Sequence, residues 1–143
     1  MAVLVVIAHP DKNSFTQQWA KESIRGARNL EHEVIVSDLY AMKFDPIEKA
    51  DHYNFTCPKN HFDVLRTQEF HSQKNSLPKE VLTELEKINK CELIIFHFPI
   101  WWFSPPAALM GWMERVFVNG ATHDTTYRFD RGKLKNKRAQ FCV

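Results

Sequence analysis

The sequence predicts an α/β domain built on a doubly wound parallel sheet. Apolar runs without polar alternation, such as Val3 to Ala8, are typical of strands that are buried on both faces. Segments with helical apolar spacing separate these runs, so that strands and helices alternate along the chain. The length of 143 residues is that of one domain. We therefore expect residues 1–143 to form a single domain.

The composition is that of an ordinary globular protein. Hydrophobic residues make up 44% of the chain and charged residues 25%, which is close to the average for globular domains. The net charge of +2 is too small to predict a nucleic-acid-binding surface. The amino terminus, MAVLVVIAHPD, lacks the basic segment and the longer apolar run of a signal peptide. These features predict a cytoplasmic protein without a nucleic-acid partner.

The cysteines and histidines show no metal-binding pattern. Three cysteines, an odd number, lie far apart and without CxxC spacing: Cys57, Cys91 and Cys142. This disfavours both a disulfide framework and a zinc site. Three histidines are nine and ten residues apart, which matches no ligand spacing: His52, His61 and His71. We therefore expect reduced thiols and no metal.

The first part of the chain predicts a strand–helix–strand unit. After the strand of residues 3–8, HPDKNS forms a polar loop, and Ser14 is placed to cap a helix from Phe15 to Leu30. The apolar residues at mostly helical spacing predict its buried face: Phe15, Trp19, Ile24 and Ala27. Glu33 to Ser37, with the sequence EVIVS, reads as the second strand.

The middle of the chain is less regular. Residues 43–75 have no sustained period and contain two prolines, so we expect an irregular excursion with no more than one helical turn. A helix should then begin with Ser76 or Leu77 near its cap and Pro78 near its first turn, and continue through Ile88.

The last part predicts a strand, a helix and a strand. Glu92 to Phe98 reads as the third strand, a helix runs from Pro106 through Val116, and Arg138 to Val143 is the fourth strand. With continuous apolar strands and alternating helices, these elements complete the expected parallel sheet of four strands.

Residues 96–117, FHFPIWWFSPPAALMGWMERVF, gather many aromatic side chains at one bend. This part of the chain is nearly uncharged over a length that could span a membrane, but Ser104-Pro105-Pro106 would break a spanning helix at its centre. We therefore expect no transmembrane segment. Two alternatives remain: a hydrophobic cap beneath the next helix, or a surface that faces a cleft or a partner chain. Neighbouring side chains diverge, so Trp101, Trp102 and Phe103 cannot all enter one core.

In the flavodoxin-like strand order 2-1-3-4, strands 1 and 3 are neighbours and a crevice opens above their carboxyl ends. The loops of residues 9–15 and 99–106 should meet there. The first loop leads into a helix whose free N–H groups favour a phosphate, and the second offers aromatic walls for a flat ring. The candidate phosphate ligands are His9, Ser14, Phe15 and Thr16. The alternatives are that Ser14 only caps the helix and that His9 is a solvated loop residue.

Three stretches, AHPDKNSFT, SDLYAMKFDP and FPIWWFSPPAALMGWMERVF, closely resemble the NAD(P)H:quinone oxidoreductase family of flavodoxin-like flavoproteins. The resemblance extends from about Val3 to the last residue. It implies a bound flavin, FAD or alternatively FMN, with its phosphates on His9, Ser14, Phe15 and Thr16. It also implies that the flavin ring lies along five residues: Pro99, Ile100, Trp101, Trp102 and Phe103.

The resemblance further implies a reaction and an assembly. Two hydride transfers would follow one another in a ping-pong mechanism, from NAD(P)H to the flavin and from the flavin to a quinone. The quinone and the nicotinamide would use one stacking site near Trp102 and Phe103. Members of this family are homodimers in which both subunits line each active site.

The sequence departs from the family in two places. Where the family carries an aromatic segment beside the substrate, this chain has Ala121-Thr122-His123; His123 could replace a tyrosine as a hydrogen-bond donor, or be a plain loop residue. In the family, the strand matching Arg138 to Val143 continues into a threonine- and glycine-rich loop, a tyrosine and a histidine that take part in hydride transfer, a fifth strand and a helix. We therefore expect a domain that is incomplete at its carboxyl end, without assigned catalytic residues. The alternative function is a non-catalytic binding or regulatory subunit that has lost its flavin.

Overall fold

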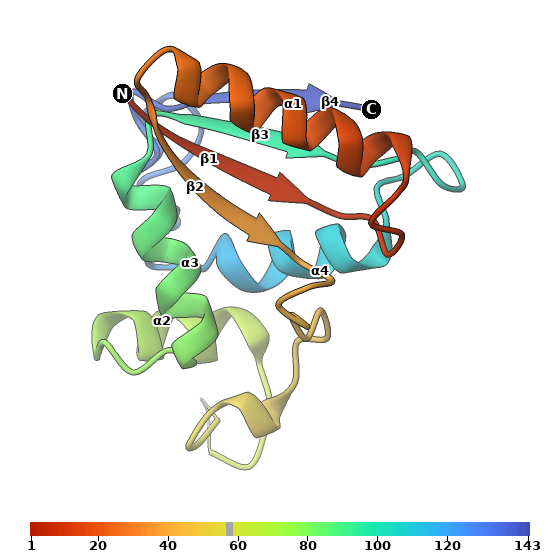
Figure 1. Ribbon diagram of the computed structural model, residues 1–143. Coiled ribbons are helices and arrows are strands. Elements are labelled where there is room, and N and C mark those ends of the chain that lie inside the picture. The colour runs from red at the N-terminus through yellow and green to blue at the C-terminus, as the bar shows by residue number, and fades with distance from the viewer. Residues whose placement is uncertain (57–58) are drawn as a thin grey trace.

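The computed structural model describes residues 1–56 and 59–143, so Cys57 and Pro58 lie outside the described residues. A four-stranded parallel sheet in the order β2-β1-β3-β4 forms its centre (Figure 1). Its strands are β1 (Ala2–Ile7), β2 (Glu33–Asp38), β3 (Leu93–His97) and β4 (Arg138–Cys142). This confirms the predicted fold class and strand order.

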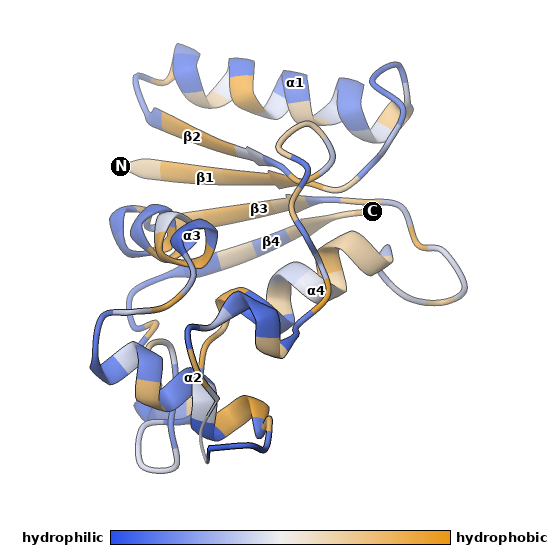
Figure 2. Cartoon of the chain, turned by 90° about the horizontal axis from the view of Figure 1, so that it is seen from below, coloured by the Kyte–Doolittle hydropathy of each residue, from blue (hydrophilic) through white to orange (hydrophobic). Residues whose placement is uncertain are grey.

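Helices cover both faces of the sheet. They are α1 (Phe15–Asn29), α2 (Val64–Gln73), α3 (Lys79–Lys90) and α4 (Ala107–Val116), with short 3₁₀ turns at Ala50–His52 and Phe129–Arg131. Helix α1 lies on one face, and α3 and α4 lie on the other (Figure 1). The central strands β1 and β3 are strongly hydrophobic and almost fully buried, as strands covered on both faces require (Figure 2). The edge strand β4 is exposed at every residue except Cys142. Among the described residues, no helix combines the length and the apolar character needed to cross a membrane.

Helix α1 begins where predicted but buries a different face. The Gln17 N–H donates to Ser14 Oγ at 3.2 Å, which confirms Ser14 as the N-cap. The buried residues are Thr16, Gln17 and Ala20, whereas the Phe15 side chain is 77% exposed. The predicted buried face was therefore wrong at Phe15 and at Trp19, which is 38% exposed. Phe15 is the first residue of the helix, and its ring lies 5.6 Å from that of Trp19 between centroids.

Helix α2 corrects the expectation of no more than one helical turn between residues 43 and 75. Its buried residues are polar, namely Thr67, Gln68 and His71, so no apolar period reveals the helix. The imidazole of His71 bonds to Ser76 Oγ at 2.8 Å and to the Phe55 carbonyl at 3.0 Å. Such partners offset the cost of removing a polar face from water.

The start of α3 also differs from the prediction by a few residues. Pro78 occupies the cap position and no side chain caps the helix, which begins at Lys79. Ser76, expected near the cap, bonds instead to His71 of α2. The serine therefore joins two helices rather than starting one.

A buried carboxylate joins the sheet to the two helices on that face. Glu84 of α3 is fully buried and accepts hydrogen bonds from Ser37 Oγ at 2.7 Å and Trp112 Nε1 at 2.9 Å. Lys87 Nζ, at 2.6 Å from Glu84 Oε1, balances its charge. Because Trp112 belongs to α4, this network fixes the helix that follows the aromatic bend, and so positions the bend itself.

Candidate functional site

The loops that follow β1 and β3 meet at the carboxyl edge of the sheet. The rings of His9 and Trp101 lie edge to face, with centroids 5.5 Å apart and an interplanar angle of 63°. Strands β1 and β3 are hydrogen-bonded neighbours, so their loops leave the sheet side by side. The strand order thus brings the candidate phosphate loop and the aromatic bend together.

The aromatic bend is a tight hairpin. Trp101 and Ser104 exchange two backbone hydrogen bonds, of 2.9 and 3.0 Å. Between them, Trp102 and Phe103 have φ values of 51° and 63°, the left-handed conformation of both central residues in a type I′ turn. Asparagine and glycine usually occupy these positions, and a bulky side chain there costs about 1–2 kcal/mol.

The hairpin presents its two central rings to solvent. The side chains of Trp102 and Phe103 are 93% and 100% exposed, and Ile100, which leads from Pro99 into the hairpin, is also exposed. Figure 1 shows this loop extending past the end of α4. For Trp102 and Phe103, the alternative of a hydrophobic cap beneath the next helix is therefore wrong.

The loop after β1 and the start of α1 present hydrogen-bond donors that are free to bind a ligand. The Asp11 N–H donates to His9 Nδ1 at 3.0 Å, so the neutral imidazole carries its proton on Nε2. Within the described residues, the N–H groups of Phe15 and Thr16 have no hydrogen-bond acceptor. Free N–H groups in the first turn of a helix are a ready binding site for a phosphate. Ser14 combines its capping role with a hydroxyl hydrogen that is free to point toward such a ligand.

Gln17 positions this loop and was missed in the sequence. Its amide donates to the carbonyl of His9 at 3.3 Å and to Asp38 Oδ2 at 3.0 Å. It thereby connects the loop after β1 to the end of β2. The sequence signal was its place three residues after Ser14, the S-x-x-Q spacing of a capping box.

His97 gives this edge a neutral, apolar wall. It ends β3, its ring is fully buried, and neither nitrogen has a hydrogen-bond partner among the residues that the structure describes. The ring of Trp19 lies against it with centroids 5.6 Å apart. Burial lowers the pKa of His97 to about 4, so the imidazole is uncharged at neutral pH.

His123 lies beyond the carboxyl end of α4, seven residues after Val116. It follows α4, where the Gly120 N–H donates to its carbonyl at 2.7 Å and its Nδ1 lies 3.2 Å from Thr122 Oγ1. The hairpin precedes α4, so the ten residues of the helix separate the two (Figure 1). A helix of this length spans about 15 Å. Within a single subunit, His123 therefore does not lie near Trp102 and Phe103.

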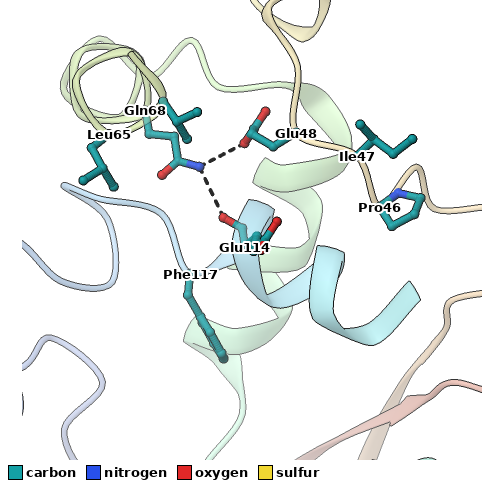
Figure 3. A pocket seen from close by; sticks show the side chains of 8 residues that line it. Pro46, Ile47, Glu48, Leu65, Gln68, Glu114 and Phe117 are labelled. Carbon is teal, nitrogen blue, oxygen red and sulfur yellow. Dashed lines mark hydrogen bonds between the residues drawn. The ribbon is translucent and has the colours of Figure 1, made fainter. Parts of the chain in front are cut away.

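An open apolar groove of about 690 Å³ lies between α2, α4 and the segment after β2. Its floor is polar: the Gln68 amide donates to Glu48 Oε2 at 2.9 Å and to the Glu114 carbonyl at 3.2 Å (Figure 3). Ile47 and Leu65 border it with side chains that are 64% and 59% exposed.

Comparison with known proteins identifies the family. A family model described as "Flavodoxin-like fold" matches residues 1–143. The chain is 35% identical to NAD(P)H dehydrogenase [quinone] 1 of Cavia porcellus and 36% identical to ribosyldihydronicotinamide dehydrogenase [quinone] of Mus musculus, and the alignments cover 98% and 96% of this chain. It spans only 51% and 60% of the length of these relatives.

A solved structure agrees with these matches. A putative quinone reductase from Klebsiella pneumoniae superimposes with a TM-score of 0.91 at 30% identity, over 99% of this chain and 57% of that one. The topology, the two loops and the matched relatives lead to one conclusion. The chain belongs to the flavodoxin-like fold family and, within it, to the NAD(P)H:quinone oxidoreductase family.

Proposed function

We propose that the chain binds FAD across the two loops at the carboxyl edge of the sheet. The contact between His9 and Trp101 carries this proposal, because it holds a phosphate-binding helix end and an exposed aromatic hairpin side by side. The N–H groups of Phe15 and Thr16 would bind the phosphates, with His9 Nε2 and Ser14 as further donors. The flavin ring would lie along the hairpin of residues 99–103.

The residues present fit such a ring. Trp102 and Phe103 extend flat apolar surface into solvent, and within the described residues their backbone N–H groups have no acceptor. Free N–H donors beside a ring stabilise negative charge that develops on it. Strained backbone that the surrounding structure maintains is typical of ligand sites.

We infer that the activity is NAD(P)H:quinone oxidoreduction. A bound flavin supplies reversible hydride transfer, from NAD(P)H in one half-reaction and to a quinone in the next, which is a ping-pong sequence. The chain orients each flat substrate against Trp102 and Phe103 and excludes water from the stacked faces.

We further propose a homodimer. His123 can contribute to a substrate site at Trp102 and Phe103 only from a second subunit, because α4 separates these residues within one chain. The groove with exposed Ile47 and Leu65 is the surface that we propose for this contact. Exposed apolar patches of this kind mark protein interfaces in otherwise polar surfaces.

The compartment that we propose is the cytoplasm. Cys91 and Cys142 are both free thiols, and burial raises the pKa of each above its usual range. Buried thiols of this kind are inert and typical of proteins in a reducing environment.

Flavin content and two half-reactions test the function. The purified chain, reconstituted with FAD or FMN and freed of excess, should retain about one flavin per chain. NADH or NADPH should bleach the flavin without quinone, and 1,4-benzoquinone should restore its colour; initial rates should give parallel double-reciprocal lines. A chain that retains neither flavin would contradict this function and favour a non-catalytic binding subunit.

The dimer is tested separately. Leu65→Glu places a charge in the groove and should give a monomer by analytical ultracentrifugation. Leu30→Glu is the matched control, because Leu30 is 70% exposed and lies at the end of α1, away from the groove. If wild-type chain sediments as a monomer at all concentrations, or if both variants stay dimeric, the proposed interface is incorrect.

A further inference from the structure

A second cavity lies beside the phosphate loop, on the side that faces β2. It has a volume of about 240 Å³ and forms between the loop after β1 and the turn after β2. Its lining includes His9, Lys12, Gln17, Asp38, Tyr40 and Lys43. His9 also contacts Trp101, so this one residue borders both the cavity and the aromatic hairpin.

The cavity carries unpaired positive charge. Lys12 and Lys43 are exposed, and neither ammonium group has an ion pair or a hydrogen bond to any described residue. Asp38 is the single acid of the lining, and each of its oxygens accepts one neutral donor: Gln17 Nε2 at 3.0 Å and the Ala41 N–H at 3.1 Å. Two lysines against one aspartate leave the lining positive overall.

The turn after β2 holds Lys43 in a strained backbone conformation. Its N–H donates to the Tyr40 carbonyl at 3.2 Å, and the next residue, Phe44, donates to the Leu39 carbonyl at 3.0 Å. Lys43 has a φ of 53°, in the left-handed region that favours glycine. A strained non-glycine residue persists where the surrounding structure maintains it, and such positions cluster at ligand clamps.

We propose that this cavity binds the phosphorylated ribose of a nucleotide. A ribose hydroxyl would donate to the carboxylate of Asp38, and the phosphate would lie between the ammonium groups of Lys12 and Lys43. A carboxylate has about four lone-pair positions, so Asp38 can accept further hydrogen bonds. In the dinucleotide-binding form of the doubly wound fold, an acid near the second strand binds a ribose hydroxyl or a nearby arginine accommodates the 2′-phosphate.

Two nucleotides of the proposed reaction carry this chemistry: FAD in its adenosine half, and NADPH in its 2′-phosphate. Their identification rests on the proposed function, whereas the site itself does not require flavin or activity. The first test therefore uses the chain as purified, without cofactor, and probes that hold only the nucleotide end.

Isothermal titration with 2′,5′-ADP, ribose 5-phosphate and adenosine tests the site. The two phosphorylated probes should bind, and adenosine should bind at least tenfold more weakly. Lys12→Gln and Lys43→Gln should each lower the affinity for 2′,5′-ADP about tenfold, as expected for the loss of one charge-assisted hydrogen bond. Lys135→Gln removes the same charge from an exposed lysine near the amino end of β4 and should leave binding unchanged. Equal binding by all three variants, or no binding by wild type, overturns the proposal.

The reconstituted protein then distinguishes the two sources. If the adenosine half of FAD occupies the cavity, Lys43→Gln lowers the affinity for FAD about tenfold and leaves the affinity for FMN unchanged. If NADPH occupies it, the same variant raises the KM for NADPH about tenfold and leaves that for NADH unchanged. Either result supports the site. A protein that binds flavin and reduces quinones, but shows neither change, overturns this inference and leaves the proposed function intact.

Discussion

The imidazole of His9 and the indole of Trp101 lie edge to face, 5.5 Å apart between ring centroids, and so join the two loops of the site. Each residue follows a different strand, and no hydrogen bond between described residues links the loops directly. This aromatic pair therefore sets the distance between the helix end and the hairpin.

Trp101→Ala should make the hairpin more mobile and weaken the binding of FAD. An edge-to-face pair contributes about 0.5–1.5 kcal/mol, which corresponds to a loss of roughly threefold to tenfold in affinity. Trp101→Phe keeps an aromatic ring at this position and should lose less FAD affinity than the alanine variant. Titration of the flavin-free protein with FAD, followed by flavin fluorescence, measures both. An alanine variant with wild-type affinity would show that the pair does not position the site.

The hairpin should show a trade between stability and binding. The rings of Trp102 and Phe103 pack against almost nothing, while their left-handed backbone is strained. Replacing them with Asn-Gly, the usual type I′ pair, should raise the free energy of unfolding by about 1 kcal/mol. The same double variant should bind FAD at least tenfold more weakly. Urea unfolding and FAD titration give the two results, and a variant that is destabilised, or that keeps its affinity, contradicts this prediction.

Two glycines in helices should respond to alanine with opposite signs. A Cβ at Gly111 of α4 would lie 2.1 Å from the Pro46 carbonyl oxygen, whereas at Gly26 of α1 it would meet nothing within 4 Å. Gly111→Ala should therefore destabilise the protein by about 1–3 kcal/mol. Gly26→Ala should stabilise it by about 1 kcal/mol through helix propensity. Thermal or urea unfolding measures both, and an equal effect at the two positions would mean that α4 and the Pro46 segment are not in close contact.

His97 should make stability depend on pH in a defined window. Burial lowers its pKa to about 4, whereas in the unfolded chain it titrates near 6.5. As the pH falls, the unfolded state takes up the proton first, so stability is full above about pH 6.5 and is lost progressively down to about pH 4. Over this window, protonation of His97 lowers the free energy of unfolding by about 3 kcal/mol in total.

His97→Phe isolates this effect. The variant removes two buried nitrogens without partners, so its stability at pH 7 should be equal or higher. Between pH 6.5 and 4, its free energy of unfolding should fall by about 3 kcal/mol less than that of the wild type. Parallel pH profiles for the two proteins would mean that His97 is accessible to water and protons in the folded state.

The sequence was sufficient for the sheet and for three of the four helices, because those elements carry a clear apolar period. The short apolar runs of Val3 to Ala8 and residues 93–98 are typical of buried strands, and the topology of parallel sheets predicted that they are neighbours. Helix α2 was not predictable in this way. Its buried Gln68 and His71 depend on partners distant in sequence, such as Glu48 and Phe55.

The candidate site was predictable in its membership but not in its geometry. Aromatic density at residues 101–103 indicated a platform, yet no turn signal such as Asn-Gly announced a type I′ hairpin. The separation of His123 from this hairpin follows from the helix that the sequence already predicts between them, which the structure places at Ala107–Val116. The role of Gln17 depends on acceptors at His9 and Asp38 that come together only in the folded chain.

The position of FAD in a crystal structure of its complex with this chain tests the central claim most directly. The account predicts phosphate oxygens within hydrogen-bond distance of the Phe15 and Thr16 N–H groups, and the flavin ring against Trp102 and Phe103. A complex with the ring away from the hairpin, or phosphates away from the start of α1, would contradict it.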